Sequence, residues 1–225
     1  MANDKAIVVV SPQYGAPDQV DLYISKKVKK TTKGRHLGVF DSNGNTIFKV
    51  KTNGLFSSRL ILVDAAGVPV VSLKSAKISL HERWKVYKGD SEDSNDLLFT
   101  VKKSHCLQFR TQLEVFLAPN TDESACDFMM KQTYREKSCV IYRGYSDTII
   151  AEMHNNEAVP VKVPGEDTCS VTIYPNVDCA FVVALRVILN EVNMCRSGGG
   201  GADLIHTVVE VGLGGGGDGD GDGGE

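Results

Sequence analysis

The feature that most constrains this chain is a short stretch near its C-terminal end that is apolar on every side. Residues 174–192 read YPNVDCAFVVALRVILNEV, and six apolar residues follow one another from Ala180 to Leu185. At about 100° per residue, such a run covers the whole circumference of a helix. The apolar run to Leu189 is interrupted only by Arg186, and about ten residues fall short of the roughly 20 that span a bilayer. The stretch therefore predicts a helix near residues 176–193 that is buried in a protein core.

The residues before this stretch are typical of a helix start. Pro175 supplies a fixed φ, Asn176 a capping oxygen, and Asp178 a negative charge near the positive end of the helix dipole. The return to solvent is marked by the polar residues Asn190, Glu191 and Asn193.

Upstream of the helix, the chain reads as a series of short strands. In Phe48-Lys49-Val50-Lys51 apolar and polar residues alternate, which is typical of a strand with one buried face. Asn43-Gly44 and Ala66-Gly67 each lie between two such segments and predict hairpin turns. We expect about twelve strands, from candidates at 20–24, 37–40, 46–51, 59–64, 69–74, 78–89, 97–103, 106–109, 112–117, 126–132, 138–144, 148–154 and 168–174.

The buried helix decides how these strands are arranged. Many short antiparallel strands either stack as a sandwich or close into a barrel, and eleven or twelve strands leave room for an axial helix. About 17 helical residues at 1.5 Å reach roughly 25 Å, close to the height of tilted strands of six or seven residues. We therefore predict a mainly β fold, a closed antiparallel barrel of about twelve strands around the hydrophobic C-terminal helix.

Composition indicates one domain with a tail. The upstream β pattern has no break, so residues 1–196 are expected to form a single domain. The start of this domain, which contains Pro12, Gly15 and Pro17, is expected to be loose. Residues 197–225 contain SGGGG and GLGGGGDGDGDGGE, and such Gly/Asp-rich sequence is expected to stay flexible. Between these two runs, ADLIHTVVEVGL could pair as an edge strand or lie on a surface.

Charge and cysteine distribution limit the classes of function that the chain can have. A net charge of -3 and a pI near 6.0 argue against non-specific nucleic-acid binding by the whole protein. The apolar run from Ile7 to Val10 is too short for a signal-peptide core, so we expect an intracellular protein. The scattered cysteines are expected to be buried thiols: Cys106, Cys126, Cys139, Cys169, Cys179 and Cys195.

The strongest local charge feature is a basic run from Lys26 to His36 that holds no acid. We expect a solvated loop here, and the hypothesis for it is docking on an anionic phospholipid or phosphoinositide surface, against the alternative of a loop with no ligand. The candidate headgroup-binding residues are Lys26, Lys27, Lys29, Lys30, Lys33 and Arg35.

Other motifs are better explained without catalysis. His81-Glu82 lacks the second histidine of an HExxH zinc site, and we expect Trp84 in the core with Glu82 and Arg83 on its rim. His105 and Cys106 are adjacent strand residues, which point to opposite faces. The tail's DGDGDG begins like an EF-hand loop, with Asp218, Asp220, Asp222 and Gly223, but has no glutamate at the twelfth position. We predict no enzyme activity, no cofactor and no metal.

Arg186 interrupts the apolar helix, and a lone buried charge is costly unless it is paired. It either extends its stem to the barrel mouth or meets an acid inside the barrel. A third alternative is that it binds a small anionic ligand at the mouth.

Several segments resemble a known family. HERWKVYKG, SCVIYRG followed by an aspartate, and above all SVTIYPNVDCAFVVALRVILNEVN are similar to the plant LURP-one-related proteins, and the two hairpins at Asp41-Ser42-Asn43-Gly44 and Asp64-Ala65-Ala66-Gly67 are similar too. The resemblance runs from about Val8 to Asn193 and implies the twelve-stranded barrel around a hydrophobic helix of tubby C-terminal domains and phospholipid scramblases. The glycine-rich tail departs from the family pattern.

The resemblance also implies a biological setting. The family is associated with plant defence, and its kinship suggests membrane-tethered transcriptional regulators. We expect a non-enzymatic binding or regulatory protein, a monomer in the cytoplasm or peripheral at the plasma membrane, that binds lipid or an unknown protein partner. The alternative is a membrane-tethered transcriptional regulator that acts in the nucleus, although the charge of the chain does not support DNA binding.

Overall fold

The structure of the chain is a computed structural model that describes residues 6–27, 36–52, 59–76, 83–104, 110–133, 138–155 and 167–197. The chain divides into two compact units, residues 1–188 and 189–225. The twelve strands of the first unit are β1 (Val20–Lys27), β2 (His36–Phe40), β3 (Thr46–Thr52), β4 (Arg59–Asp64), β5 (Pro69–Ala76), β6 (Arg83–Lys88), β7 (Leu97–Ser104), β8 (Arg110–Leu117), β9 (Phe128–Thr133), β10 (Ser138–Arg143), β11 (Ile149–Asn155) and β12 (Asp167–Ile173).

Three helices complete the described chain. Two are short 3-10 helices, η1 (Pro12–Tyr14) and η2 (Ser94–Asp96). The third is α1 (Cys179–Ser197), whose last turns, from Leu189, belong to the second unit. Over the described ranges, no helix is long and apolar enough to cross a membrane.

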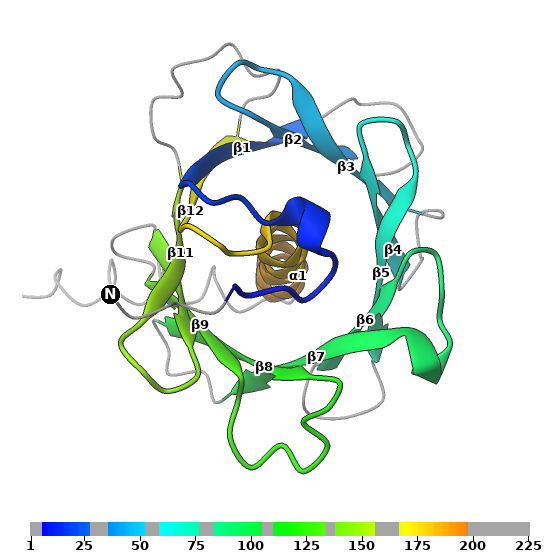
Figure 1. Ribbon diagram of the computed structural model, residues 1–225, viewed down its shortest axis with the longest axis vertical. Helices are drawn as coiled ribbons and strands as arrows, with labels where there is room; N and C mark the ends of the chain where they lie inside the picture. Colours follow the sequence, from blue (N-terminus) through cyan, green and yellow to red (C-terminus); the bar gives the residue numbers. More distant parts are fainter. Residues whose placement is uncertain are drawn as a thin grey trace, which may run out of the picture. The chain divides into compact units, whose positions relative to one another are not determined.

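The strands form a closed antiparallel barrel. Each strand pairs with its neighbours in sequence, and β1 closes the ring by pairing with β12, with Val20 opposite Ile173 and Lys26 opposite Asp167 (Figure 1). Closure leaves no free strand edge on which another chain could add. The predicted mainly β fold and closed barrel are confirmed.

The first half of α1 fills the barrel (Figure 1). Every residue from Ala180 to Leu185 is 0% exposed, as is Ile188. The ring of Phe181 packs against Phe99 of β7 at 5.1 Å between centroids and against Phe128 of β9 at 4.9 Å. Because these helix residues are fully buried and Phe181 packs against two strands of the wall, the helix acts as the core of the barrel.

The start of the helix lies slightly later than predicted. Asp178, rather than Asn176, is the residue before the first helical position, and its Oδ1 accepts the Phe181 N–H at 3.1 Å. Asn176 instead has a φ of 62° in the turn that joins β12 to α1. Because the backbone of Asn176 is left-handed, the α-helix begins after it, at Cys179. At its other end α1 runs to Ser197, past the predicted end near residue 193.

The two predicted hairpin turns are present. Asp41 Oδ1 accepts the N–H groups of Asn43 and Asn45 at 2.9 and 2.8 Å, and Gly44 has a φ of 83°. The β4–β5 turn has the same kind of contact, since Asp64 Oδ1 accepts the Val68 N–H at 2.9 Å. In each turn an aspartate fixes the loop and a glycine takes the positive φ.

The N-terminal segment is ordered, which corrects the expectation of a loose start. Ile7 forms a parallel bridge with Val177, and the Asn176 N–H donates to the carbonyl of Ala16 at 2.7 Å. Figure 1 shows this segment crossing the barrel where α1 begins. The sequence pattern missed it because its partners lie more than 150 residues away and its own residues show no periodicity.

Some strand predictions need adjustment. The candidate strand at 106–109 lies outside the described residues. Strict alternation along β6 would place Tyr87 on the face opposite Trp84, yet Tyr87 is also buried, at 7% exposure. The register of β6 against β7 shifts between Val86 and Tyr87, which is a bulge that alters the simple alternation.

Candidate functional site

We name the two ends of the barrel by residues that mark them. At the Asp178 end, β12 passes into α1 and the N-terminal segment crosses the barrel. At the Lys27 end, β1 finishes at Lys27 and β2 begins at His36.

The basic run lies at the Lys27 end. Lys26 and Lys27 are the last two residues of β1, where Lys26 lies between Asp167 of β12 and Leu37 of β2. The prediction of a loop that starts at Lys26 is therefore wrong at its edges, because the ladder to both neighbouring strands continues through Lys26 and the backbone hydrogen bonds of a strand do not depend on side-chain charge. The other four candidate residues, Lys29, Lys30, Lys33 and Arg35, lie outside the described residues.

Arg186 points its side chain toward the same end. It is partly buried, its Nη2 donates to Asn155 Oδ1 at 3.1 Å, and its Nε donates to Cys169 Sγ at 3.4 Å. Asn155 is the last residue of β11 and pairs with Cys169 of β12, which also pairs with Ile24 of β1. Lys26 follows Ile24 by two residues, or about 7 Å along the strand.

Both of these contacts are neutral acceptors. Among the described residues, no acid pairs with Arg186 inside the barrel, so the alternative of an internal ion pair is not observed within them. The side chain instead reaches toward the barrel end, as the first of the sequence alternatives proposed.

The thiols around Arg186 are free. Burial raises the pKa of the Cys139 thiol, in β10, to about 12, although the nearby charge of Arg186 acts to lower it. Cys169 accepts from Arg186 and donates its own S–H to the Ser170 carbonyl at 3.3 Å. The buried-thiol prediction is confirmed for Cys126, Cys139 and Cys169, whereas Cys179 is partly exposed.

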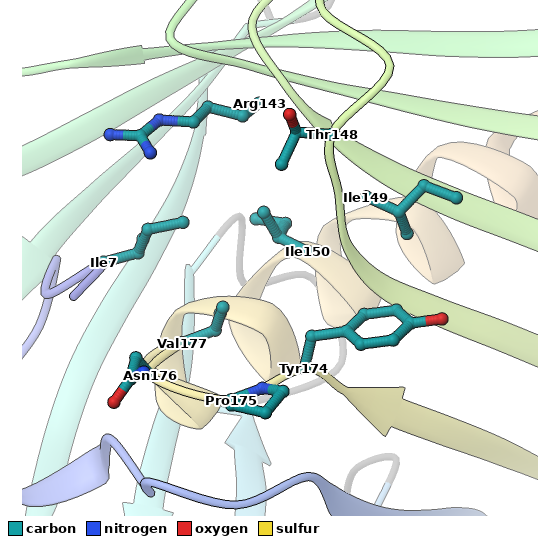
Figure 2. Close-up of a pocket in the computed structure, with 9 residues that line it drawn as sticks. All are labelled: Ile7, Arg143, Thr148, Ile149, Ile150, Tyr174, Pro175, Asn176 and Val177. Atoms are coloured by element: carbon teal, nitrogen blue, oxygen red, sulfur yellow. The ribbon is translucent and has the colours of Figure 1, made fainter. Parts of the chain in front are cut away.

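A cavity of about 300 Å³ lies at the Asp178 end (Figure 2). Three segments far apart in sequence line it: Ile7 of the N-terminal segment, the β10–β11 hairpin with Arg143, and the turn before α1 with Tyr174. Figure 2 shows the Arg143 guanidinium and the Tyr174 hydroxyl at opposite sides of the lining residues. The Tyr174 hydroxyl donates to Glu152 Oε1 at 3.3 Å. Sequence reasoning missed the cavity because no motif joins these segments.

Three acids of the described loops, Asp90, Glu92 and Glu123, form structural ion pairs. Glu123, in the β8–β9 loop, receives Arg83 Nη1 at 2.6 Å and also pairs with Lys102. Hydrogen bonding from Arg83, and then from Lys102, outweighs desolvation and holds the pKa of Glu123 at about 2. These contacts tie the β8–β9 loop to β6 and β7, and the same loop contributes Cys126 to a buried apolar cluster with Phe116 and Met129.

The acidic loop after β6 is held in the same way. Glu92 pairs with Arg59 at 3.2 Å and with Lys74, whose hydrogen bond lowers the pKa of Glu92. Asp90 also accepts from Arg59 Nη2, at 2.6 Å. These ion pairs hold the loop against Arg59 of β4 and Lys74 of β5, so the carboxylates stabilise the fold.

The motifs set aside as non-catalytic fall partly within the described chain. Trp84 is 7% exposed, as expected of a core residue, and Arg83 is engaged by Glu123. His81, Glu82, His105, Cys106 and the tail aspartates lie outside the described residues. Among the residues that are described, no three His, Cys, Asp or Glu side chains are grouped as metal ligands would be.

Comparison with known proteins places the barrel in a family. A profile of LURP-one-related proteins matches residues 20–190, from the first residue of β1 into α1. The chain belongs to the LURP-one-related family. LURP-one-related 15 of Arabidopsis thaliana is 48% identical over 188 residues, which cover 83% of this chain and 86% of that protein. LURP-one-related 10 of the same plant is 44% identical over 190 residues, which cover 83% of this chain and 97% of that protein.

A solved structure is also similar to this chain. The X-ray structure of an Arabidopsis thaliana protein is 42% identical and superposes with a TM-score of 0.64, over 83% of this chain and 98% of that one. The basic run and Arg186 both fall inside the stretch that matches the LURP-one-related profile, whereas Ile7 of the cavity precedes it.

Proposed function

We propose that this LURP-one-related chain is a non-catalytic binding protein that docks on anionic phospholipid surfaces through the Lys27 end of its barrel. The observation that carries the proposal is the register of β1, which ends in Lys26 and Lys27 and is followed by four further cations before β2 begins. β1 ends and β2 begins at the same end of the barrel, so the basic run starts and finishes at that end.

The size of the electrostatic attraction is sufficient for reversible docking. Each Lys or Arg near an anionic leaflet contributes about 1 kcal/mol, so six could contribute up to about 6 kcal/mol at low salt. The net charge of -3 means that the attraction is local rather than a property of the whole protein. Binding should therefore weaken steeply above physiological ionic strength, where the Debye length falls below about 8 Å.

A binding role is also supported by how the described ionisable groups are used. Glu123 and Glu92 are tied into ion pairs with two cations each. The interior next to Phe181 is filled by apolar helix and strand residues. We carry over plant defence as the setting, on the strength of the family resemblance.

Liposome flotation tests the proposal. Full-length protein is mixed with phosphatidylcholine vesicles with or without phosphatidylserine or phosphoinositide, and we expect flotation only with the anionic vesicles. A variant with six Lys/Arg→Gln changes in the basic run should lose at least about 90% of it. The matched control carries the same change at six exposed cations elsewhere: Lys49, Lys51, Lys85, Lys88, Lys131 and Arg143.

The control separates a local site from total charge. Flotation retained by the control but lost by the basic-run variant supports docking at the Lys27 end. Equal flotation by the wild type and the basic-run variant removes the lipid proposal for this segment. Accumulation of a fluorescent fusion in nuclei, together with DNA pull-down, would instead favour the transcriptional alternative.

A further inference from the structure

Arg186 has hydrogen-bonding capacity that the described residues do not use. A guanidinium carries five N–H groups in a fixed fork. One meets Cys169 Sγ and one meets Asn155 Oδ1, so the remaining three have no partner among the residues that the structure describes. The side chain is only partly buried, so part of it is accessible to solvent.

Arg186 also lacks a counter-charge within the described ranges, unlike Arg59 and Arg83. Arg83 and Arg59 each have a carboxylate oxygen at 2.6 Å. The neighbouring thiol of Cys139 stays protonated at physiological pH, because burial raises its pKa to about 12, and it supplies no negative charge. A guanidinium on an apolar helix is costly when its charge is not compensated, and an anion would remove that cost.

We propose that Arg186 and Asn155 bind the phosphate group of an anionic ligand at the Lys27 end of the barrel. Phosphate matches the fork in a bidentate manner, with two parallel N–H···O bonds. Asn155 turns its carbonyl oxygen toward Arg186, which leaves its amide N–H groups as additional donors for another phosphate oxygen. The adjacent basic run raises the local concentration of such anions.

The phosphate could come from a lipid headgroup or from a free phosphate compound, and the chemistry at the fork is the same. The lipid source rests on the proposed function, because the same barrel end would then face the membrane. The free source does not require membrane docking.

Calorimetric titration of the full-length protein at low ionic strength tests the site. The probes are inorganic phosphate and dihexanoyl phosphatidate, with dihexanoyl phosphatidylcholine as the neutral-headgroup comparison. The variants are Arg186→Met, which removes the charge at similar length, and Arg186→Lys, which keeps a charge without the fork. Lys49→Gln, at an exposed position of β3, is the control for loss of one positive charge.

We expect phosphatidate to bind the wild type and phosphatidylcholine not to. The dissociation constant should rise at least about tenfold in Arg186→Met, as expected for loss of charge-assisted hydrogen bonds, and by less in Arg186→Lys. Lys49→Gln should change it less than about twofold. Inorganic phosphate bound with the same dependence on Arg186 identifies a free phosphate as a sufficient ligand, and binding of phosphatidate alone identifies the lipid.

Failure of this site can be told from failure of membrane docking. Loss of phosphate binding in Arg186→Met, with retention in the basic-run variant, assigns the site to Arg186 whatever the flotation result. Wild-type affinity in Arg186→Met, or no binding of either probe by the wild type, overturns the site and leaves the flotation test unaffected. If Arg186→Met does not fold, Arg186→Lys decides, and unchanged affinity in it overturns the bidentate contact.

Discussion

Placing a charge on the helix inside the barrel should abolish folding, and Val183→Asp is the sharpest case. Val183 is 0% exposed, and so are Ala180 and Ala184 on the same helix. Losing the buried valine side chain costs about 1.5–3 kcal/mol. Keeping the new carboxyl group neutral at pH 7 requires its pKa to rise by about three units, which costs about 4 kcal/mol more.

The sum of about 6 kcal/mol is comparable to the whole stability of a typical domain, which is about 5–15 kcal/mol. We therefore expect insoluble or non-cooperatively folded protein. Val68→Asp is the matched control, because Val68 is 58% exposed in the β4–β5 turn and the change there should cost less than about 0.5 kcal/mol. Val183→Ala should fold with a loss of about 2–3 kcal/mol.

The assay can use the fluorescence of Trp84, the only tryptophan of the chain, which is buried in β6. Urea unfolding of the wild type and of the Val183→Ala and Val68→Asp variants gives their free energies of unfolding. A soluble Val183→Asp protein with a cooperative transition near that of the wild type would refute the enclosure of the helix.

Two further predictions concern the carboxylates that hold loops in place. Glu123→Gln should lower the free energy of unfolding at pH 6 by about 1–2 kcal/mol. Since the folded pKa of Glu123, about 2, lies below its ordinary value of 4.5, its contribution is complete above pH 4.5 and is lost as the pH falls toward 2. Urea unfolding of both proteins across this range should show the difference shrink; a constant difference would contradict the ion-pair explanation. Asp178→Asn should cost about 2–3 kcal/mol, because Oδ2 accepts the N–H groups of Val9, Val10 and Ser11 at 3.2, 2.7 and 3.1 Å. Limited proteolysis should then cleave the N-terminal segment faster; an unchanged rate would contradict its dependence on Asp178.

Much of the fold could be predicted from local patterns. The uninterrupted apolar run from Ala180 required a helix enclosed on all sides, and alternating strands with Asp/Gly turns supplied the wall. Strand count and helix length then favoured a closed barrel over a sandwich. These inferences depend on near neighbours in the sequence, where periodicity carries the information.

What could not be predicted depends on residues that meet only in the folded chain. Asp178 was recognised as a helix-start residue, but its second oxygen binds backbone N–H groups about 168 residues away. Glu123 showed no sign of its partners Arg83 and Lys102, because an ion pair across strands leaves no periodic signal. Arg186 was identified as exceptional, whereas its neutral partners depend on the register of β11 and β12.

The most direct test of the functional account is amide hydrogen exchange of the full-length protein with and without anionic vesicles. The account predicts slower exchange at the Lys27 end, at residues 24–27 and 36–38, and no change at the Asp178 end around residues 174–178. Protection confined to the Asp178 end, or no protection anywhere under conditions where the protein floats with the vesicles, would contradict the assignment of the membrane-binding surface.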